Sequence, residues 1–161
     1  PQTAVGRSIA VALLQALADD STATALYVGT ALRIYALPLQ VDRCLATLRD
    51  VHRQGRLHGV ALGAAQAALR QLVVPQIPLA DLENLLTQLV QSNEEELRVL
   101  GVAVLATLTA PKQGQGWTAA RRALLLRLCQ DPAAAVAEAA QFTFPPLEEG
   151  SAGKDGRISQ A

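Results

Sequence analysis

The chain has 161 residues, a formal net charge of zero and an apolar content of 50%. Aromatic residues contribute only 3%, so the apolar fraction is mainly Leu, Ala and Val, which favours an all-α protein over a β-sandwich. The lack of a basic excess argues against nucleic acid as a partner. No apolar stretch is long enough to span a membrane, so membrane insertion is not expected.

The first residue and the cysteines bear on the cellular location. The chain starts at Pro1 and contains no Met, which indicates a piece of a longer protein or a processed form. No secretory signal peptide is visible in the sequence. Cys44 and Cys129 stand 85 residues apart without a CxxC motif, which is more typical of buried thiols than of a disulfide. These features predict an intracellular location, cytoplasmic or nuclear.

Apolar residues recur at helical spacing in segments that come in pairs, separated by prolines, glycines and short polar turns. In chain order, helices are expected over 7–19 and 22–36, 40–53 and 57–73, 79–91 and 94–109, and 118–130 and 132–144. Pro145 and Pro146 end the last helix, and the residues beyond them are polar and rich in glycine. We therefore expect a helical domain over 1–146 and a flexible tail over 147–161.

Two kinds of helix alternate in these pairs. The segment 79–91 has one apolar stripe, whereas 97–108 is apolar nearly all round and must be covered on several sides. The second helices also share a register, because Leu57, Leu97 and Val136 stand 40 and 39 residues apart and each is followed four residues later by Ala or Gly. A small residue at that place lets a neighbouring helix approach closely, and such a period is typical of helical solenoids.

The repeated segments resemble the HEAT-repeat family. The residues that carry the resemblance are Asp131-Pro132 with Val136 and Ala140, and Asn93 with Leu97-Arg98 and Gly101. The resemblance covers about residues 7–144 and implies a right-handed α-solenoid of about four stacked antiparallel helical hairpins. His58 and Ala137 occupy the positions that correspond to Arg98, so the ladder of Asp and Arg residues that joins repeats in the family is incomplete here.

The acidic cluster Glu94–Glu96 is the first candidate for chemistry. Neighbouring carboxylates on a helix point about 100° apart and do not face one another, so they do not form the paired carboxyls of acid/base catalysis. Acidic residues in a first helical turn are stabilised by the helix dipole. Ser92 or Asn93 is a good N-cap, and Ser92 with Glu95 fits a capping box. The cluster is therefore interpreted as the start of a buried helix.

The two histidines, His52 and His58, flank an expected turn between helices. Neither has a carboxylate, a cysteine or a third histidine at the spacing of a metal site. A solvated or helix-capping role is expected for both. The sequence therefore predicts no catalytic residues, no cofactor, no metal site and no enzymatic activity.

Charge is arranged in bands of alternating sign. Residues 33–72 carry a net charge of +4, residues 73–111 carry −4, and residues 112–131 carry +3. The preferred interpretation is that adjacent repeats complement one another electrostatically. The other interpretation is a banded surface that selects and steers a charged partner.

Aromatic residues near the C-terminal end are expected to have packing roles. Trp117 begins a helix and is predicted to pack on the next turn as a staple, with an exposed anchor for a partner as the alternative. Phe142, Phe144 and Leu147 are expected to cap the open end of the stack.

The resemblance and the lack of catalytic motifs predict a scaffold or adaptor module for protein–protein interaction, as part of a larger protein or complex. The second helix of each pair would line a concave face that binds another protein or a peptide, and neighbouring repeats of a longer chain are a further partner. The polar residues expected to contact the partner are His58, Gln66, Arg70, Arg98, Thr107, Glu138 and Gln141. Arg98 suits an ion pair between repeats equally well.

Three alternatives remain open from the sequence. HEAT-like folds also serve alkyl-purine DNA glycosylases, which need a basic concave track with aromatic residues, so a nucleic-acid-processing module would show as retention on heparin. They also occur in phycobilin lyase-type proteins, which would show as visible absorbance on purification. The third alternative is a purely structural cap of a longer repeat array.

Overall fold

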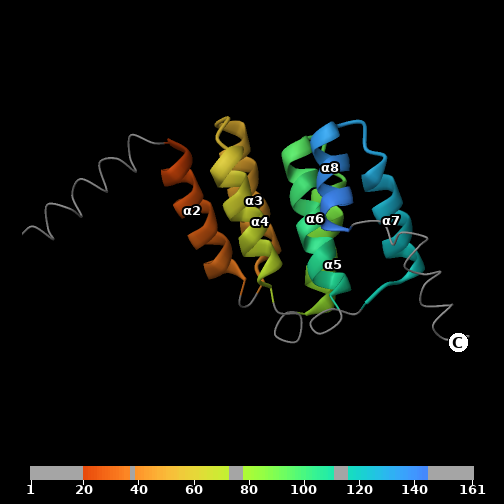
Figure 1. The fold of residues 1–161 in the computed structure, drawn as a ribbon. Coiled ribbons are helices and arrows are strands. Elements are labelled where there is room, and N and C mark those ends of the chain that lie inside the picture. Colours follow the sequence, from red (N-terminus) through yellow and green to blue (C-terminus); the bar gives the residue numbers. More distant parts are fainter. Residues whose placement is uncertain (1–19, 37–38, 73–77, 111–115, 145–161) are drawn as a thin grey trace, which may run out of the picture.

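The computed structural model describes residues 20–36, 39–72, 78–110 and 116–144, which fold into helices (Figure 1). These are α2 (Asp20–Tyr35), α3 (Val41–Arg53), α4 (Gly59–Arg70), α5 (Leu79–Val90), α6 (Glu95–Thr109), α7 (Ala119–Cys129) and α8 (Ala134–Thr143). The predicted all-α class is confirmed, and the bounds of these helices agree with the predicted ones to within three residues. The helix expected over 7–19 and the tail over 147–161 lie outside the described residues.

The helices are arranged in two rows. In the first row α2 packs against α4, α4 against α6, and α6 against α8. In the second row α3 packs against α5, and an ion pair between Glu83 and Arg121 joins α5 to α7. The rows contact each other mainly where α2 meets α3, α5 meets α6 and α7 meets α8. Helices that alternate along the chain are therefore neighbours within a row.

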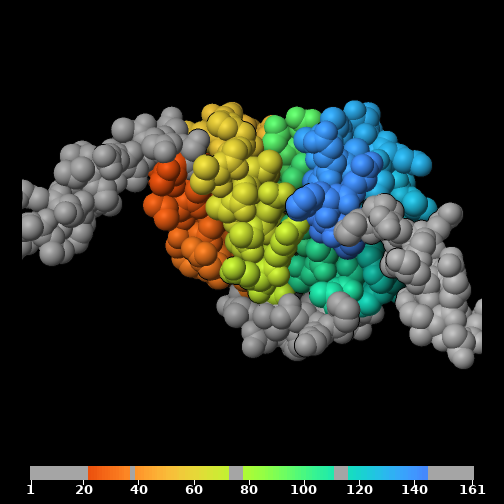
Figure 2. Space-filling model, in the orientation of Figure 1, coloured from red at the N-terminus to blue at the C-terminus, as the bar shows by residue number. Residues whose placement is uncertain are grey.

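Helix α6 is the centre of this arrangement. It contacts α3, α4, α5, α7 and α8, and nearly all of its residues from Leu97 to Thr109 are buried. The ends of α4 and α8 also meet, because Arg70 Nη2 donates a hydrogen bond of 2.9 Å to Thr143 Oγ1 (Figure 2). The prediction that the apolar segment 97–108 is covered on several sides is confirmed.

The predicted register is met in α6 and α8 but not in α4. Leu97 and Val136 are buried and are each the third residue of their helix, whereas Leu57, also buried, precedes the N-cap residue of α4, whose third residue is Ala61. The small residues four positions after Leu97 and Val136, Gly101 and Ala140, are buried too. At Gly101 the contact is very close, since a Cβ atom there would lie 2.6 Å from Val90 Cγ1 and 3.5 Å from Leu89 Cβ. The lack of a side chain at this position therefore allows the end of α5 to lie directly on α6.

Replacing Gly101 by Ala is expected to destabilise the fold by about 1–2 kcal/mol, because the overpacking against Val90 outweighs the gain in helix propensity. The matched control is Gly63→Ala in α4, where a Cβ atom would meet no atom within 4 Å. The control is expected to raise the free energy of unfolding by up to about 1 kcal/mol. Urea unfolding monitored by circular dichroism measures both, and equal stabilisation by the two variants would contradict the close packing at Gly101.

The start of α6 differs from the predicted cap. Glu94 takes the N-cap position, in place of Ser92 or Asn93, and its side chain makes no capping hydrogen bond. Instead, the Ser92 hydroxyl donates to Glu94 Oε2 at 2.6 Å and accepts from the Glu94 amide at 3.2 Å. The predicted capping box is therefore wrong, because Ser92 lies two residues before the N-cap position and its side chain stabilises the turn in front of the helix.

Large apolar side chains are exposed on α2 and α8, the outermost helices of the first row among the described residues. On α2, Leu26, Tyr27 and Ile34 are 60%, 54% and 63% exposed, and on α8 Phe142 is 86% exposed. The prediction that Phe142 caps the stack is wrong, whereas Leu147 lies outside the described residues. Trp117 packs edge-to-face against Phe144, with ring centroids 5.3 Å apart, so it contacts the residue that follows α8.

Within the described ranges, no helix is both long enough and apolar enough to cross a lipid bilayer.

Candidate partner-binding surface

The seven residues predicted to contact a partner lie in different environments. His58, Arg70, Glu138 and Gln141 are exposed, Gln66 and Arg98 are half-buried, and Thr107 is buried. His58 occupies the N-cap position of α4 without a capping hydrogen bond from its side chain. Gln141 donates to the carbonyl of Cys129 at 3.3 Å, and Arg70 binds Thr143. The four exposed residues lie at the surface of α4 and α8, where a partner could contact them, although Arg70 and Gln141 already make these hydrogen bonds within the chain.

Thr107 cannot serve as a contact residue. Its hydroxyl donates to the carbonyl of Leu69 on α4 at 3.0 Å and lies 3.3 Å from the carbonyl of Ala103, one turn earlier on α6. A buried hydroxyl needs such a partner, and the backbone carbonyls supply it. The prediction for Thr107 is therefore wrong, because a polar side chain on α6 can be satisfied within the core.

Arg98 is held in an ion pair with Asp131 in the turn before α8. Its Nε and Nη2 atoms donate to the two carboxylate oxygens at 2.9 and 3.0 Å, and its Nη1 donates to the carbonyls of Ser92 and Asn93. The Arg98 and Asp131 side chains are only 16% and 10% exposed. These hydrogen bonds, donated by Arg98 and accepted by Asp131, lower the pKa of Asp131 and raise the pKa of Arg98. Arg98 therefore joins the start of α6 to the turn before α8 through an ion pair, the other role considered for it.

Two further pairs join residues from bands of opposite charge. Arg121 on α7 is buried, and its Nη2 donates to Glu83 Oε1 on α5 at 2.8 Å, while its Nη1 donates to the carbonyl of Gly116 at 2.7 Å. His52, at the end of α3, lies 3.1 Å from Glu96 at the start of α6. His52 therefore bonds a carboxylate of α6 rather than the carbonyls at its own helix end. These contacts agree with the interpretation that segments of opposite charge complement one another.

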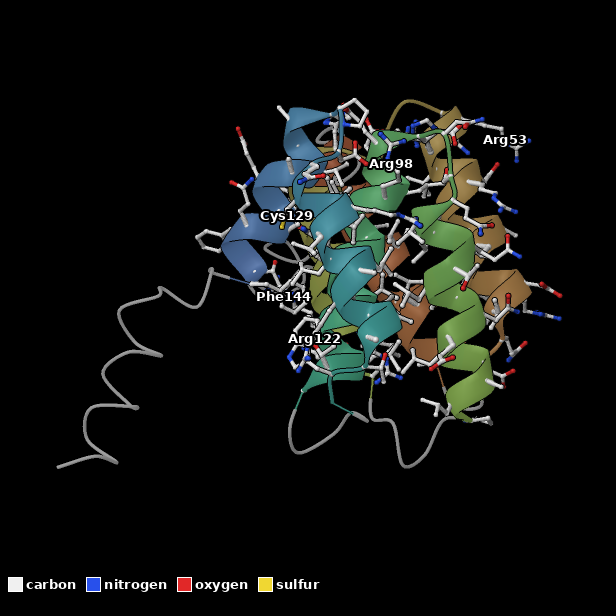
Figure 3. The ribbon with its side chains drawn as sticks, turned by 90° about the vertical axis from the view of Figure 1, so that its right-hand side faces the viewer. Arg53, Arg98, Arg122, Cys129 and Phe144 are labelled. Carbon is white, nitrogen blue, oxygen red and sulfur yellow. The ribbon has the colours of Figure 1, made fainter. Side chains whose placement is uncertain are left out.

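A hollow of about 450 Å³ lies between the end of α3 and the start of α6. It is lined by Ala46, Arg49, His52, Arg53, Glu94 and Leu97. Ala46 and Leu97 give it an apolar part. A hydrogen bond from Ser92 lowers the pKa of Glu94, with smaller contributions from a backbone hydrogen bond of Glu94 and from the nearby charge of Arg49. Arg53 and Arg98 lie at this same end of the helices (Figure 3).

A second hollow, of about 360 Å³, lies at the opposite end of α3. Its lining combines the start of α3 with the start of α5, in the residues Leu39, Gln40, Val41, Asp42, Arg43, Asp81 and Asn84. Neither hollow contains any of the seven predicted contact residues. The sequence did contain a signal for the hollow at the end of α3. His52 and Arg53 follow Arg49 by three and four residues, so the three basic side chains share one side of a helix.

The described residues show no group of three or more His, Cys, Asp or Glu side chains placed to hold a metal ion. Both cysteines are free thiols, as predicted, with Cys44 buried and Cys129 half-buried. Burial raises the pKa of the Cys44 thiol to about 11, so it is a poor nucleophile at neutral pH.

Comparison of the chain with models of known protein families, with curated proteins and with solved structures found no match.

Proposed function

We propose that this domain is a scaffold or adaptor module for protein–protein interaction, built as a right-handed α-solenoid of HEAT-like hairpins within a larger protein or complex. The two rows of helices support the solenoid, and so do the buried Leu97 and Val136, which occupy the same position in α6 and α8. In such an array each hairpin buries its apolar face only against its neighbours, and an end needs a cover. The proposal gives the domain no catalytic role.

The observation that carries the function is the exposed apolar face of α2. Leu26, Tyr27 and Ile34 stand on α2, the outermost helix of the first row among the described residues, and are each more than half exposed. A grouped exposure of large apolar side chains is typical of a protein-interaction surface. We therefore infer that this end of the domain meets another protein.

The test uses a photoreactive amino acid in place of Tyr27 in the full-length protein, irradiated in the cells from which it comes. A covalent adduct with another protein is expected, and it should disappear when Leu26 and Ile34 are both replaced by Gln. The same probe in place of Arg127, an exposed residue of α7, is the control. An adduct confined to the same chain would assign the face to neighbouring repeats, and the absence of any protein adduct at position 27 would overturn the proposed function.

A further inference from the structure

One stripe of α3 connects the two hollows. Asp42, Ala46, Arg49 and Arg53 are three or four residues apart, so they share one face of the helix. Asp42 belongs to the hollow at the start of α3, and the other three belong to the hollow at its end. We call this stripe and the two hollows the α3 seam; its opposite wall comes from α5 at one end and from α6 at the other.

The end of the seam that contains Arg49 has unused hydrogen-bond donors. Arg49 is exposed and makes no hydrogen bond or ion pair within the described part of the chain. Arg53 Nη2 donates a hydrogen bond to Asp50 Oδ1 at 3.2 Å. The Arg53 side chain is 75% exposed, so most of its other donors face water. Glu94 is the carboxylate in this hollow, and it already accepts a hydrogen bond from Ser92. A guanidinium has five donors and binds carboxylates in a bidentate manner.

The other end of the seam has unused acceptors. Asp42 and Asp81 lie in the hollow at the start of α3, and neither forms a hydrogen bond or an ion pair with a described residue. Arg43 also borders this hollow, but its guanidinium lies over the ring of Tyr35, 5.7 Å from the ring centroid. The two ends of the seam therefore differ in charge: carboxylates dominate one and guanidinium groups the other.

We propose that the α3 seam binds an extended segment of another protein that carries one basic and one acidic residue. The basic residue is held by Asp42 and Asp81, and the acidic residue by Arg49 and Arg53. Seven to eleven residues of helix separate Asp42 from these arginines, which corresponds to roughly 10–16 Å. An extended chain covers that distance in roughly three to five residues. Ala46 leaves space for the segment between the two charges.

This inference rests on the proposed function, and it adds the surface and the chemistry of the partner. The main-chain groups of an extended segment need hydrogen-bond partners. Gln40 and Asn84 lie in the hollow at the start of α3, and their side-chain amides can both donate and accept. The charged ends then fix the register of the segment, which is the usual effect of electrostatic complementarity.

The experiment selects peptides from a random dodecapeptide library displayed on phage, with the full-length chain as bait. Enriched peptides are synthesised with a fluorescent label, and their dissociation constants are measured by fluorescence anisotropy. We expect them to share a basic and an acidic residue three to five positions apart. Arg49→Glu is expected to weaken their binding at least tenfold. Peptides in which the acidic residue is changed to Lys are expected to bind Arg49→Glu more tightly than the original peptides do.

The matched control is Arg122→Glu, which makes the same charge change at an exposed residue of α7 and should leave the dissociation constants unchanged. Unchanged binding to Arg49→Glu would overturn the seam as the site and leave the proposed function standing. If no peptide is enriched but the probe at position 27 yields a protein adduct, the seam alone is again overturned. If neither experiment yields a partner, both proposals fall.

Discussion

Replacing Leu100 by Asp should unfold the domain as a unit. Leu100 is fully buried in α6, the helix that contacts both rows. An ionised carboxylate at that place would have no partner, and the loss of the leucine would also leave a cavity. We expect a loss of more than about 4 kcal/mol in the free energy of unfolding, which is comparable to the total stability of many domains. Thermal unfolding followed by circular dichroism would show no cooperative transition, or one at a much lower temperature.

The matched control for this change is Leu126→Asp. Leu126 is on α7 and is 64% exposed, so the same substitution there loses little packing and leaves the carboxylate in water. A loss of about 1 kcal/mol or less is expected, mainly from the lower helix propensity of Asp. If Leu100→Asp melted like Leu126→Asp, the placement of α6 at the centre of the fold would be wrong.

Arg98→Ala is expected to cost about 3 kcal/mol at neutral pH, because it leaves Asp131 charged, mostly buried and without its guanidinium partner. Urea unfolding measures this loss. The pair Arg53–Asp50 gives the comparison, since those side chains are 75% and 48% exposed. Arg53→Ala is expected to change the free energy of unfolding by only about 0–0.5 kcal/mol.

The effect of Arg98→Ala should depend on pH in a defined direction. The pKa of Asp131 is lowered in the folded chain, chiefly by the hydrogen bond from Arg98. Its contribution to stability is therefore complete above the ordinary pKa of an aspartate, about 3.9, and is lost as the pH falls through the lower folded value. The difference between the wild type and Arg98→Ala should shrink as the pH drops below about 4. A difference that stayed constant down to pH 2, or that persisted in an Asp131→Asn background, would exclude this ion pair as the cause.

The helices and their register could be predicted because both depend on local periodicity. An amphipathic stripe such as that of α5 identifies the helix and its buried side together. The shared register of Leu97 and Val136 follows in the same way, because each is the buried third residue of its helix, whereas Leu57 precedes α4 and does not share that position. Periodicity does not decide the handedness of the array.

The contacts between helices that are distant in the sequence could not be predicted in the same way. Arg121 and Arg122 are adjacent residues of the same type, yet Arg121 is buried against Glu83 and Arg122 is exposed. Apolar residues occur on all sides of α7, so its sequence does not show which side faces α5. Thr107 was misplaced for a related reason, because a hydroxyl that bonds backbone carbonyls can be buried at little cost. Both outcomes depend on packing between segments about 38 residues apart.

The buried thiol of Cys44 makes opening of the α2–α3 region measurable without any substitution. With a pKa of about 11, only about one Cys44 side chain in ten thousand is a thiolate at pH 7, and alkylating reagents require thiolate and access together. Cys129 is half-buried and provides a reference within the same molecule. The ratio of the two labelling rates therefore reports how often the core around α3 opens enough to expose the Cys44 thiol. A ligand that suppresses this local opening would slow the labelling of Cys44 alone.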